Sequence, residues 1–133
     1  MPWLEENLMT VIILAVVAWM VWGRIVQPKL LGIKKITADK YKGFKDEPHT
    51  LVDVRSIGEW RGGRASNAIH IPLDEVRSRM TRIPKDKPVV LICASGMRSG
   101  MAATMLAKAG YSSVYNFSGG MGSWCAAKLP TKS

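Results

Sequence analysis

The chain has 133 residues, of which 47% are hydrophobic and 22% are charged, and its formal net charge at pH 7 is +9. This length leaves room for one domain of ordinary size, and from Gln27 onward 18 Lys and Arg stand against 8 Asp and Glu, a net of +10. Such an excess suggests anionic partners, such as lipid headgroups or small anions. Nucleic acid is excluded as an expected partner, since the sequence has neither a basic stripe with interleaved aromatic residues nor a nucleic-acid-binding motif.

The first predicted element is an apolar segment from Leu8 to Gly23, which has no charged residue. Counted through Val26 it spans about 28 Å as a helix, close to the thickness of a bilayer core. One alternative is a buried core helix, but a helix that is apolar on all sides would need more protein around it than the remaining residues provide. A cleaved signal peptide would need a basic start and a small-residue cleavage site, and neither is present. We therefore predict an uncleaved transmembrane anchor over residues 1–26.

The charges that flank this segment predict its orientation. Two acidic residues and no basic residue precede it, whereas four basic residues follow it closely, namely Arg24, Lys29, Lys34 and Lys35. The positive-inside rule then places the N-terminus outside and the rest of the chain in the cytoplasm. We expect a single-pass protein of the inner membrane, in contact with membrane lipid and with a membrane protein as a candidate partner. Because the cytoplasm is reducing, both cysteines are expected as thiols.

Beyond the anchor, short strands alternate with helices. We expect a linker over 27–32, a folded domain over 33–130 and a tail over 131–133. Strands are predicted at 33–36, 50–54, 68–71, 88–92 and 113–117, and helices at 37–42, 56–61, 74–82, 100–109 and 122–128. Thr37 and Ser56 are candidate N-caps. The strands are apolar on both faces, which favours an α/β fold with a parallel sheet covered by helices on each side.

The segment that follows the fourth predicted strand carries the clearest chemical signal. Its residues are Cys93, Ala94, Ser95, Gly96, Met97, Arg98 and Ser99. A loop of this kind lies at the carboxyl edge of a parallel sheet, where ligand sites form. The loop N–H groups, the next helix N-terminus and the Arg98 charge all favour the thiolate of Cys93. A buried core cysteine is the alternative, but the combination predicts a nucleophilic cysteine.

The polar residues around Cys93 each have two interpretations. Arg98 either binds an anion or braces the loop, and we favour anion binding. Ser95 and Ser99 either donate hydrogen bonds to the sulfur or cap the following helix. Asp53 and Arg55, which end the second strand, either contact substrate or form a buried pair that fixes the neighbouring loops.

Short motifs occur in a fixed order along the soluble part. They are Asp53-Val54-Arg55, Glu59-Trp60, Ala68-Ile69-His70-Ile71-Pro72-Leu73, the Cys93–Ser99 loop, and Gly119-Gly120-Met121 with Trp124. In this order, from about Ile33 to Pro130, the chain resembles the single-domain rhodaneses, a family of sulfurtransferases, and among them the members with one N-terminal membrane span. It departs from the family at Gly63-Arg64-Ala65, where Gly-His-Ile is frequent, and at Lys128-Leu129-Pro130, where Gly-Leu-Pro is frequent.

The resemblance implies an α/β/α sandwich around a five-stranded parallel sheet and a sulfur-transfer reaction. Cys93 would take a sulfane sulfur from a donor such as thiosulfate, hold it as a persulfide, and pass it to a thiol or to cyanide. The loop N–H groups would stabilise the persulfide and the leaving sulfite, and neither a metal nor an organic cofactor is implied. We interpret His70 as structural, and Cys125 as a packed helix residue rather than a resolving thiol.

Two other function classes stay open. One is a cysteine-loop phosphatase or arsenate reductase of related fold, which places the arginine one residue later because its loop holds a tetrahedral anion. The four residues between Cys93 and Arg98 suit a single sulfur atom better. The other is a non-catalytic membrane-anchored scaffold, although inactive relatives usually lack the loop cysteine.

Overall fold

The computed structural model describes residues 2–133, which fall into two compact units with the boundary after Leu30. The first unit is helical and consists of α1 (Pro2–Glu6), α2 (Leu8–Val21), the π-helical η1 (Trp22–Val26) and α3 (Gln27–Leu30). The stretch Leu8–Val26 is long and apolar enough to cross a membrane, a property that signal sequences and some core helices of soluble proteins share. None of its residues is buried. Within the expected linker over 27–32, the chain is helical through Leu30.

The second unit, Leu31–Ser133, is built on a five-stranded parallel sheet, which confirms the predicted α/β class. The strands are β1 (Lys34–Ile36), β2 (Thr50–Asp53), β4 (Ile69–His70), β5 (Val89–Ile92) and β6 (Val114–Phe117). Their order is β1-β6-β5-β2-β4, and all four neighbouring pairs are parallel. The central strand β5 is buried along its whole length, as a continuous apolar run predicts. Cys93, which directly follows β5, therefore lies in the middle of the carboxyl edge.

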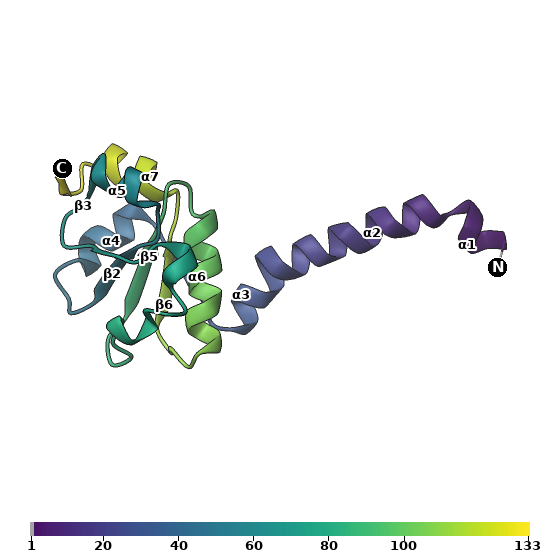
Figure 1. Cartoon of the computed structure of the whole chain (residues 1–133), viewed down its shortest axis with the longest axis horizontal. Coiled ribbons are helices and arrows are strands. Elements are labelled where there is room, and N and C mark those ends of the chain that lie inside the picture. Colours follow the sequence, from purple (N-terminus) through teal and green to yellow (C-terminus); the bar gives the residue numbers. More distant parts are fainter. Residues whose placement is uncertain (1) are drawn as a thin grey trace. The chain divides into compact units, whose positions relative to one another are not determined.

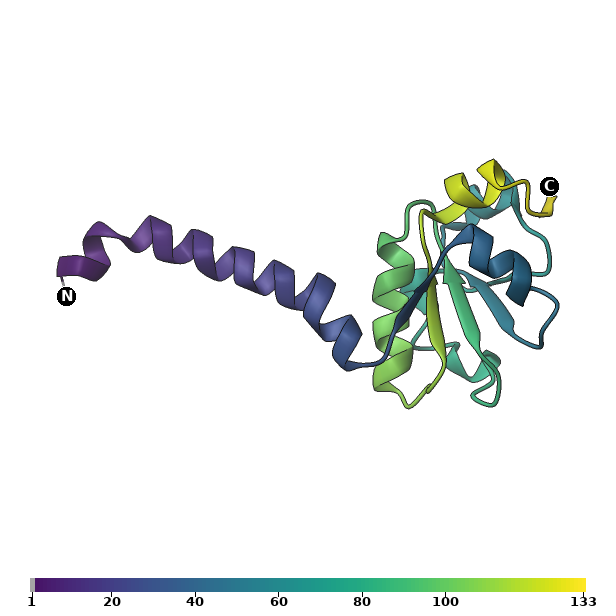
Figure 2. The ribbon, with the colours of Figure 1, turned by 180° about the vertical axis from the view of Figure 1, so that it is seen from behind.

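Helices cover both faces of this sheet (Figure 1; Figure 2). The helix α6 (Met97–Lys108) lies on one face, and α4 (Ala38–Phe44) and α7 (Gly120–Ala126) lie on the other. Alternate residues of β5 enter two separate cores. Val89 and Leu91 pack with α6 residues such as Leu106. Val90 and Ile92 pack with residues of the opposite layer, among them Tyr41 and Trp124. Cys93 continues the alternation and belongs to the core on the α6 side.

The helices α4 and α5 (Ile57–Arg61) begin at the N-caps that the sequence predicts. The Thr37 hydroxyl accepts the Lys40 N–H at 3.3 Å. Ser56 and Glu59 form a reciprocal capping box, in which the Ser56 hydroxyl accepts the Glu59 N–H and the Glu59 carboxylate accepts the Ser56 N–H at 3.1 Å. The box orients the Glu59 side chain back toward the start of α5, at the carboxyl edge of the sheet.

The predicted helix over 74–82 is wrong. The segment instead forms two single turns of 3₁₀ helix, η2 (Leu73–Glu75) and η3 (Met80–Arg82). Residues 77–79 between them are exposed, so the segment lacks the buried stripe that stabilises a longer helix. Tyr111, which is distant in the sequence, donates its hydroxyl to the carbonyls of Met80 and Ile83. These contacts fix the end of the segment against the core on the α6 side, to which Tyr111 belongs.

The residues of the expected tail include a short strand. Thr131–Lys132 form β7, which pairs antiparallel with β3 (Arg64–Ala65) in a separate two-stranded sheet. The indole N–H of Trp124 donates to the Pro130 carbonyl at 2.9 Å. Together these contacts attach the end of the chain to α7 and to the loop that follows α5.

Candidate active site

The sulfur of Cys93 lies inside the loop that the sequence singled out. The Gly96 N–H donates to Sγ at 2.9 Å, and the Ser99 hydroxyl lies 3.3 Å from Sγ. Gly96 has a φ of 104°, a backbone conformation that glycine adopts without a Cβ penalty and that turns its N–H inward. Cys93 itself is 0% exposed, whereas the small residues Ala94 and Ser95 that follow it are exposed. The loop therefore encloses the sulfur under its own backbone.

Asn116 supports the loop from the neighbouring strand β6, and the sequence did not point to it. Its Oδ1 accepts the Ser99 hydroxyl at 2.6 Å, and its Nδ2 donates to the Gly96 carbonyl at 3.1 Å. The Ser99 hydroxyl has one proton, so it serves either Asn116 Oδ1 or a Cys93 thiolate. A thiol can instead donate its own proton to Ser99. The only sign in the sequence is a polar residue inside an otherwise apolar strand.

The pKa of Cys93 is lower than that of an ordinary thiol. Burial is the largest single effect and raises this pKa, because it disfavours the charged form. Hydrogen bonds from the Ser99 hydroxyl and from the N–H groups of Ser99, Gly96 and Ser95 oppose burial and together outweigh it. The arrangement therefore favours a nucleophilic thiolate, as the sequence predicts.

The start of α7 packs against the backbone of the Cys93 loop. The Met121 N–H donates to the Cys93 carbonyl at 2.9 Å. Gly120 is in the left-handed region with a φ of 59°, and a Cβ at this position would overlap the backbone of Cys93 and Ala94. The Gly-Gly pair therefore allows a close approach of α7 to the sulfur-binding loop.

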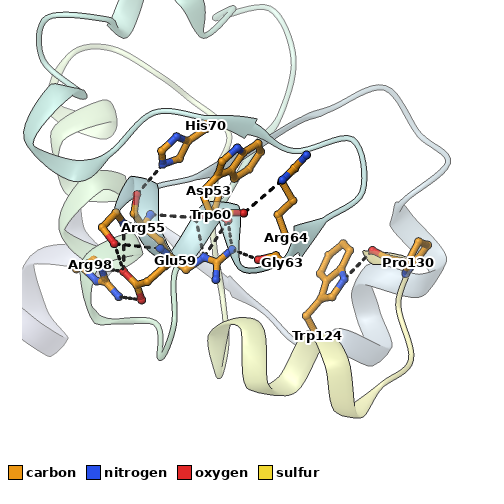
Figure 3. Close-up of polar contacts among 11 residues, drawn as sticks. Asp53, Arg55, Glu59, Trp60, Gly63, Arg64, His70, Arg98, Trp124 and Pro130 are labelled. Atoms are coloured by element: carbon orange, nitrogen blue, oxygen red, sulfur yellow. Dashed lines mark hydrogen bonds and ion pairs between the residues drawn. The ribbon is translucent and has the colours of Figure 1, made fainter. Parts of the chain in front are cut away.

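Arg98 points toward Glu59 on α5 (Figure 3). Its two terminal nitrogens donate to the two carboxylate oxygens of Glu59, at 2.7 and 2.9 Å. This pairing lowers the pKa of Glu59 to about 2, chiefly through the Arg98 hydrogen bond, and raises that of Arg98. The pair joins residues 39 positions apart and braces the loop against α5. Both terminal nitrogens are thus engaged, so the geometry supports the bracing interpretation of Arg98.

Asp53 and Arg55 form a buried ion pair at the end of β2. The Arg55 Nε lies 3.0 Å from both Asp53 oxygens, and the Arg55 terminal nitrogen donates to the Gly63 carbonyl at 2.7 Å. The two side chains are 0% and 8% exposed. Their contacts join the sheet edge to the loop after α5 (Figure 3), which supports the structural interpretation of the pair.

The other residues that the sequence analysis discussed are His70, Met97 and Cys125. His70 Nε2 lies 2.7 Å from the Arg55 carbonyl, and its ring stacks on Trp60 with the centroids 4.7 Å apart, in line with a structural role. Met97 is exposed on the loop. Cys125 is exposed on α7, so the prediction of a packed residue is wrong. Within residues 2–133, no group of three or more His, Cys, Asp and Glu side chains is placed to hold a metal ion.

Comparison with known proteins relates this arrangement to a family. The sequence pattern of the Rhodanese-like domain matches residues 37–127. YqhL, an uncharacterized protein of Bacillus subtilis, is 33% identical over 122 residues, 91% of this chain and 94% of that protein. A sulfurtransferase of Allochromatium vinosum is 40% identical over 80 residues, 60% of this chain and 75% of that protein. A rhodanese-related protein of Thermoplasma volcanium has a solved structure with a TM-score of 0.67 and 33% identity, covering 74% of this chain and 97% of that one.

Proposed function

The chain belongs to the rhodanese-like family. We propose that it is a sulfurtransferase in which Cys93 carries the transferred sulfur as a persulfide. The observation that carries the proposal is the placement of the Cys93 sulfur. It lies at the centre of the carboxyl edge, within 2.9 Å of the Gly96 N–H, with a pKa below the ordinary range because the loop hydrogen bonds outweigh burial. These features favour an attacking thiolate and stabilise a terminal sulfur that carries negative charge.

The first step is attack by the Cys93 thiolate on the sulfane sulfur of a donor such as thiosulfate. A bond forms between Cys93 Sγ and that sulfur, and the bond between the two donor sulfurs breaks. The bonding electron pair leaves with sulfite. Charge is conserved, since the thiolate and the thiosulfate dianion give a persulfide anion and the sulfite dianion. Cys93 is 0% exposed in the structure, so the proposed reaction requires the loop around Sγ to open for the donor.

The second step returns the cysteine to its starting form. A thiolate acceptor attacks the outer sulfur of the persulfide, a new sulfur–sulfur bond forms on the acceptor, and the electron pair of the broken bond returns to Cys93 Sγ. Cyanide reacts in the same way and gives thiocyanate. The loop N–H groups and the Ser99 hydroxyl stabilise the thiolate that leaves, because they already lie against Sγ.

The direct test is the intact mass of the reduced protein after incubation with thiosulfate. We expect a gain equal to one sulfur atom, reversed by a thiol reductant, because a persulfide exchanges with thiols and a stable adduct does not. The same protein alkylated at its thiols before incubation is the control and should gain nothing. An unmodified mass after incubation with thiosulfate and with an organic persulfide would favour a non-catalytic scaffold instead.

We also propose that the segment Leu8–Val26 anchors the protein in the inner membrane, with the catalytic unit in the cytoplasm. Its support is the length and apolar composition of this helix, with acidic residues before it and basic residues after it. The match to YqhL spans 91% of the chain and so extends into this segment. A cytoplasmic site keeps Cys93 reduced between turnovers and supplies thiol acceptors. Membrane lipid and a membrane protein are then the neighbouring partners.

Removing residues 1–30 should separate anchoring from catalysis. The full chain is expected to float with lipid vesicles in a density gradient, whereas the truncated chain should stay with the soluble fraction and keep the thiosulfate reaction, since the family pattern lies entirely beyond Leu30. Protease added outside intact cells should leave the catalytic unit uncut. Digestion of that unit, or a mature protein that lacks the apolar segment, would contradict the proposed topology.

A further inference from the structure

The Glu59–Arg98 pair places a carboxylate against the arginine of the sulfur-binding loop. Both terminal nitrogens of Arg98 are paired with the two Glu59 oxygens, so the guanidinium presents its fork to Glu59 and away from an incoming donor. The charge of Cys93 contributes to the raised pKa of Arg98, after the larger effect of Glu59. The loop therefore contains an arginine whose charge is already balanced.

We propose that Glu59 is a specificity-determining residue, which disfavours the thiosulfate dianion and favours an organic persulfide as the sulfur donor. The inference rests on the proposed sulfurtransferase function and narrows its substrate class. Three features of the structure support it: the independent placement of Glu59, the charge balance at the loop, and the apolar side chains beside it.

Glu59 does not depend on Arg98 for its position. The capping box of α5 fixes its carboxylate, since Oε1 accepts both the Ser56 N–H at 3.1 Å and the Ser56 hydroxyl at 2.9 Å. The Glu59 side chain is therefore placed by the helix start, and Arg98 binds to a carboxylate already in position. A donor that takes the Arg98 fork must displace a bidentate partner that stays anchored through Ser56.

Charge balance then separates the two classes of donor. Thiosulfate brings two negative charges toward a Cys93 thiolate, with Glu59 cancelling the positive charge that would attract it. An organic persulfide brings a single negative charge, so it is repelled less. In the transfer step its outer sulfur bonds to Cys93 Sγ, the sulfur–sulfur bond of the donor breaks, and the electron pair leaves with the organic thiolate. The Cys93 thiolate and the donor persulfide anion give a Cys93 persulfide anion and an organic thiolate, so the total charge is unchanged.

Exposed apolar side chains also lie close to both members of the pair along the chain. Met97, directly before Arg98, is 60% exposed, and Met101, one turn further along α6, is 52% exposed. On α5, two residues before Glu59, Ile57 is 51% exposed. An organic donor buries apolar surface against such side chains, and inorganic thiosulfate has none to bury.

The test compares thiosulfate and freshly prepared cysteine persulfide as donors for the full chain and for Glu59→Gln. The substitution removes the charge but keeps an oxygen for Ser56 and for one Arg98 nitrogen. We expect kcat/KM for thiosulfate to rise about tenfold, mostly through KM, while the value for cysteine persulfide changes less than about twofold. The gain should shrink at high salt, because the pair is partly exposed. Glu47→Gln, an equal charge change before the start of β2, should leave the donor ratio unchanged.

Two outcomes would overturn the inference. If Glu59→Gln lowers both rates alike, Glu59 only holds Arg98 in place. The second outcome concerns a chain in which Arg98 is already replaced by Gln. If Glu59→Gln still raises kcat/KM for thiosulfate in that background, the effect of Glu59 does not depend on Arg98. Failure of the sulfurtransferase proposal is distinct from both, since the unaltered chain would then accept sulfur from neither donor.

Discussion

Cys93→Ser is expected to abolish thiocyanate formation from thiosulfate and cyanide, whereas Cys125→Ser should retain most of the activity. A serine hydroxyl in this loop remains protonated near neutral pH and forms no persulfide, so both steps of the transfer are lost. We expect a fall of at least about a thousandfold, as for removal of a covalent nucleophile. The fold should survive, because the serine oxygen can take the hydrogen bond that the Gly96 N–H donates to Sγ at 2.9 Å.

The matched variant separates the two cysteines of the chain. Cys125 is exposed on α7, and no loop N–H or hydroxyl is found against its sulfur among the contacts of residues 2–133. It therefore lacks the hydrogen bonds that lower the pKa of Cys93. Equal loss of activity in the two variants would mean that Cys125 takes part in the transfer, for example as the thiol that accepts the sulfur from Cys93.

The features that could be predicted from the sequence are those determined by contiguous residues. The loop from Cys93 to Ser99 combines a strand end, small residues and a helix start within one short segment, and its conformation follows from that local pattern. The N-caps at Thr37 and Ser56 are local in the same sense, and both are confirmed. The parallel sheet follows from strands that are apolar on both faces.

The features that could not be predicted depend on contacts between distant segments. Asn116 reaches Ser99 from a neighbouring strand, 17 positions away, and Glu59 reaches Arg98 across 39 positions. Without the register of the strands, neither pairing can be selected from the many polar residues available. The sequence alone therefore offers no partner for Arg98 to set against the anion-binding interpretation. The error over 74–82 also involves a distant residue, since the Tyr111 hydroxyl binds the carbonyls of Met80 and Ile83 at the end of this segment.

Gly120→Ala is expected to damage both stability and catalysis, because α7 approaches the loop at this residue. An added methyl group would overlap the carbonyl of Ala94 and the carbonyl oxygen of Cys93, which are backbone atoms and cannot rotate away. Its φ of 59° adds a further penalty for a residue with a Cβ. Together these effects should cost about 3 kcal/mol in the free energy of unfolding.

The catalytic effect follows from which atoms must move. To accept the methyl group, either α7 shifts outward or the backbone of Cys93 and Ala94 shifts inward, and both changes alter the placement of the loop N–H groups around Sγ. An oxyanion-type site loses about 10²-fold or more when one donor is misplaced. We therefore expect a comparable fall in kcat with thiosulfate at a temperature where the variant remains folded, as judged by circular dichroism.

Gly122→Ala provides the matched control for this prediction. Gly122 lies on the same helix, two residues further on, and an added Cβ there meets nothing within 4 Å. This variant should keep full activity and gain up to about 1 kcal/mol from the better helix propensity of alanine. Denaturant unfolding and steady-state rates of the two variants would be measured side by side. Gly120→Ala with an unchanged unfolding midpoint and rate would show that α7 does not hold the loop, and the loop would then be positioned by Asn116 and the Glu59–Arg98 pair alone.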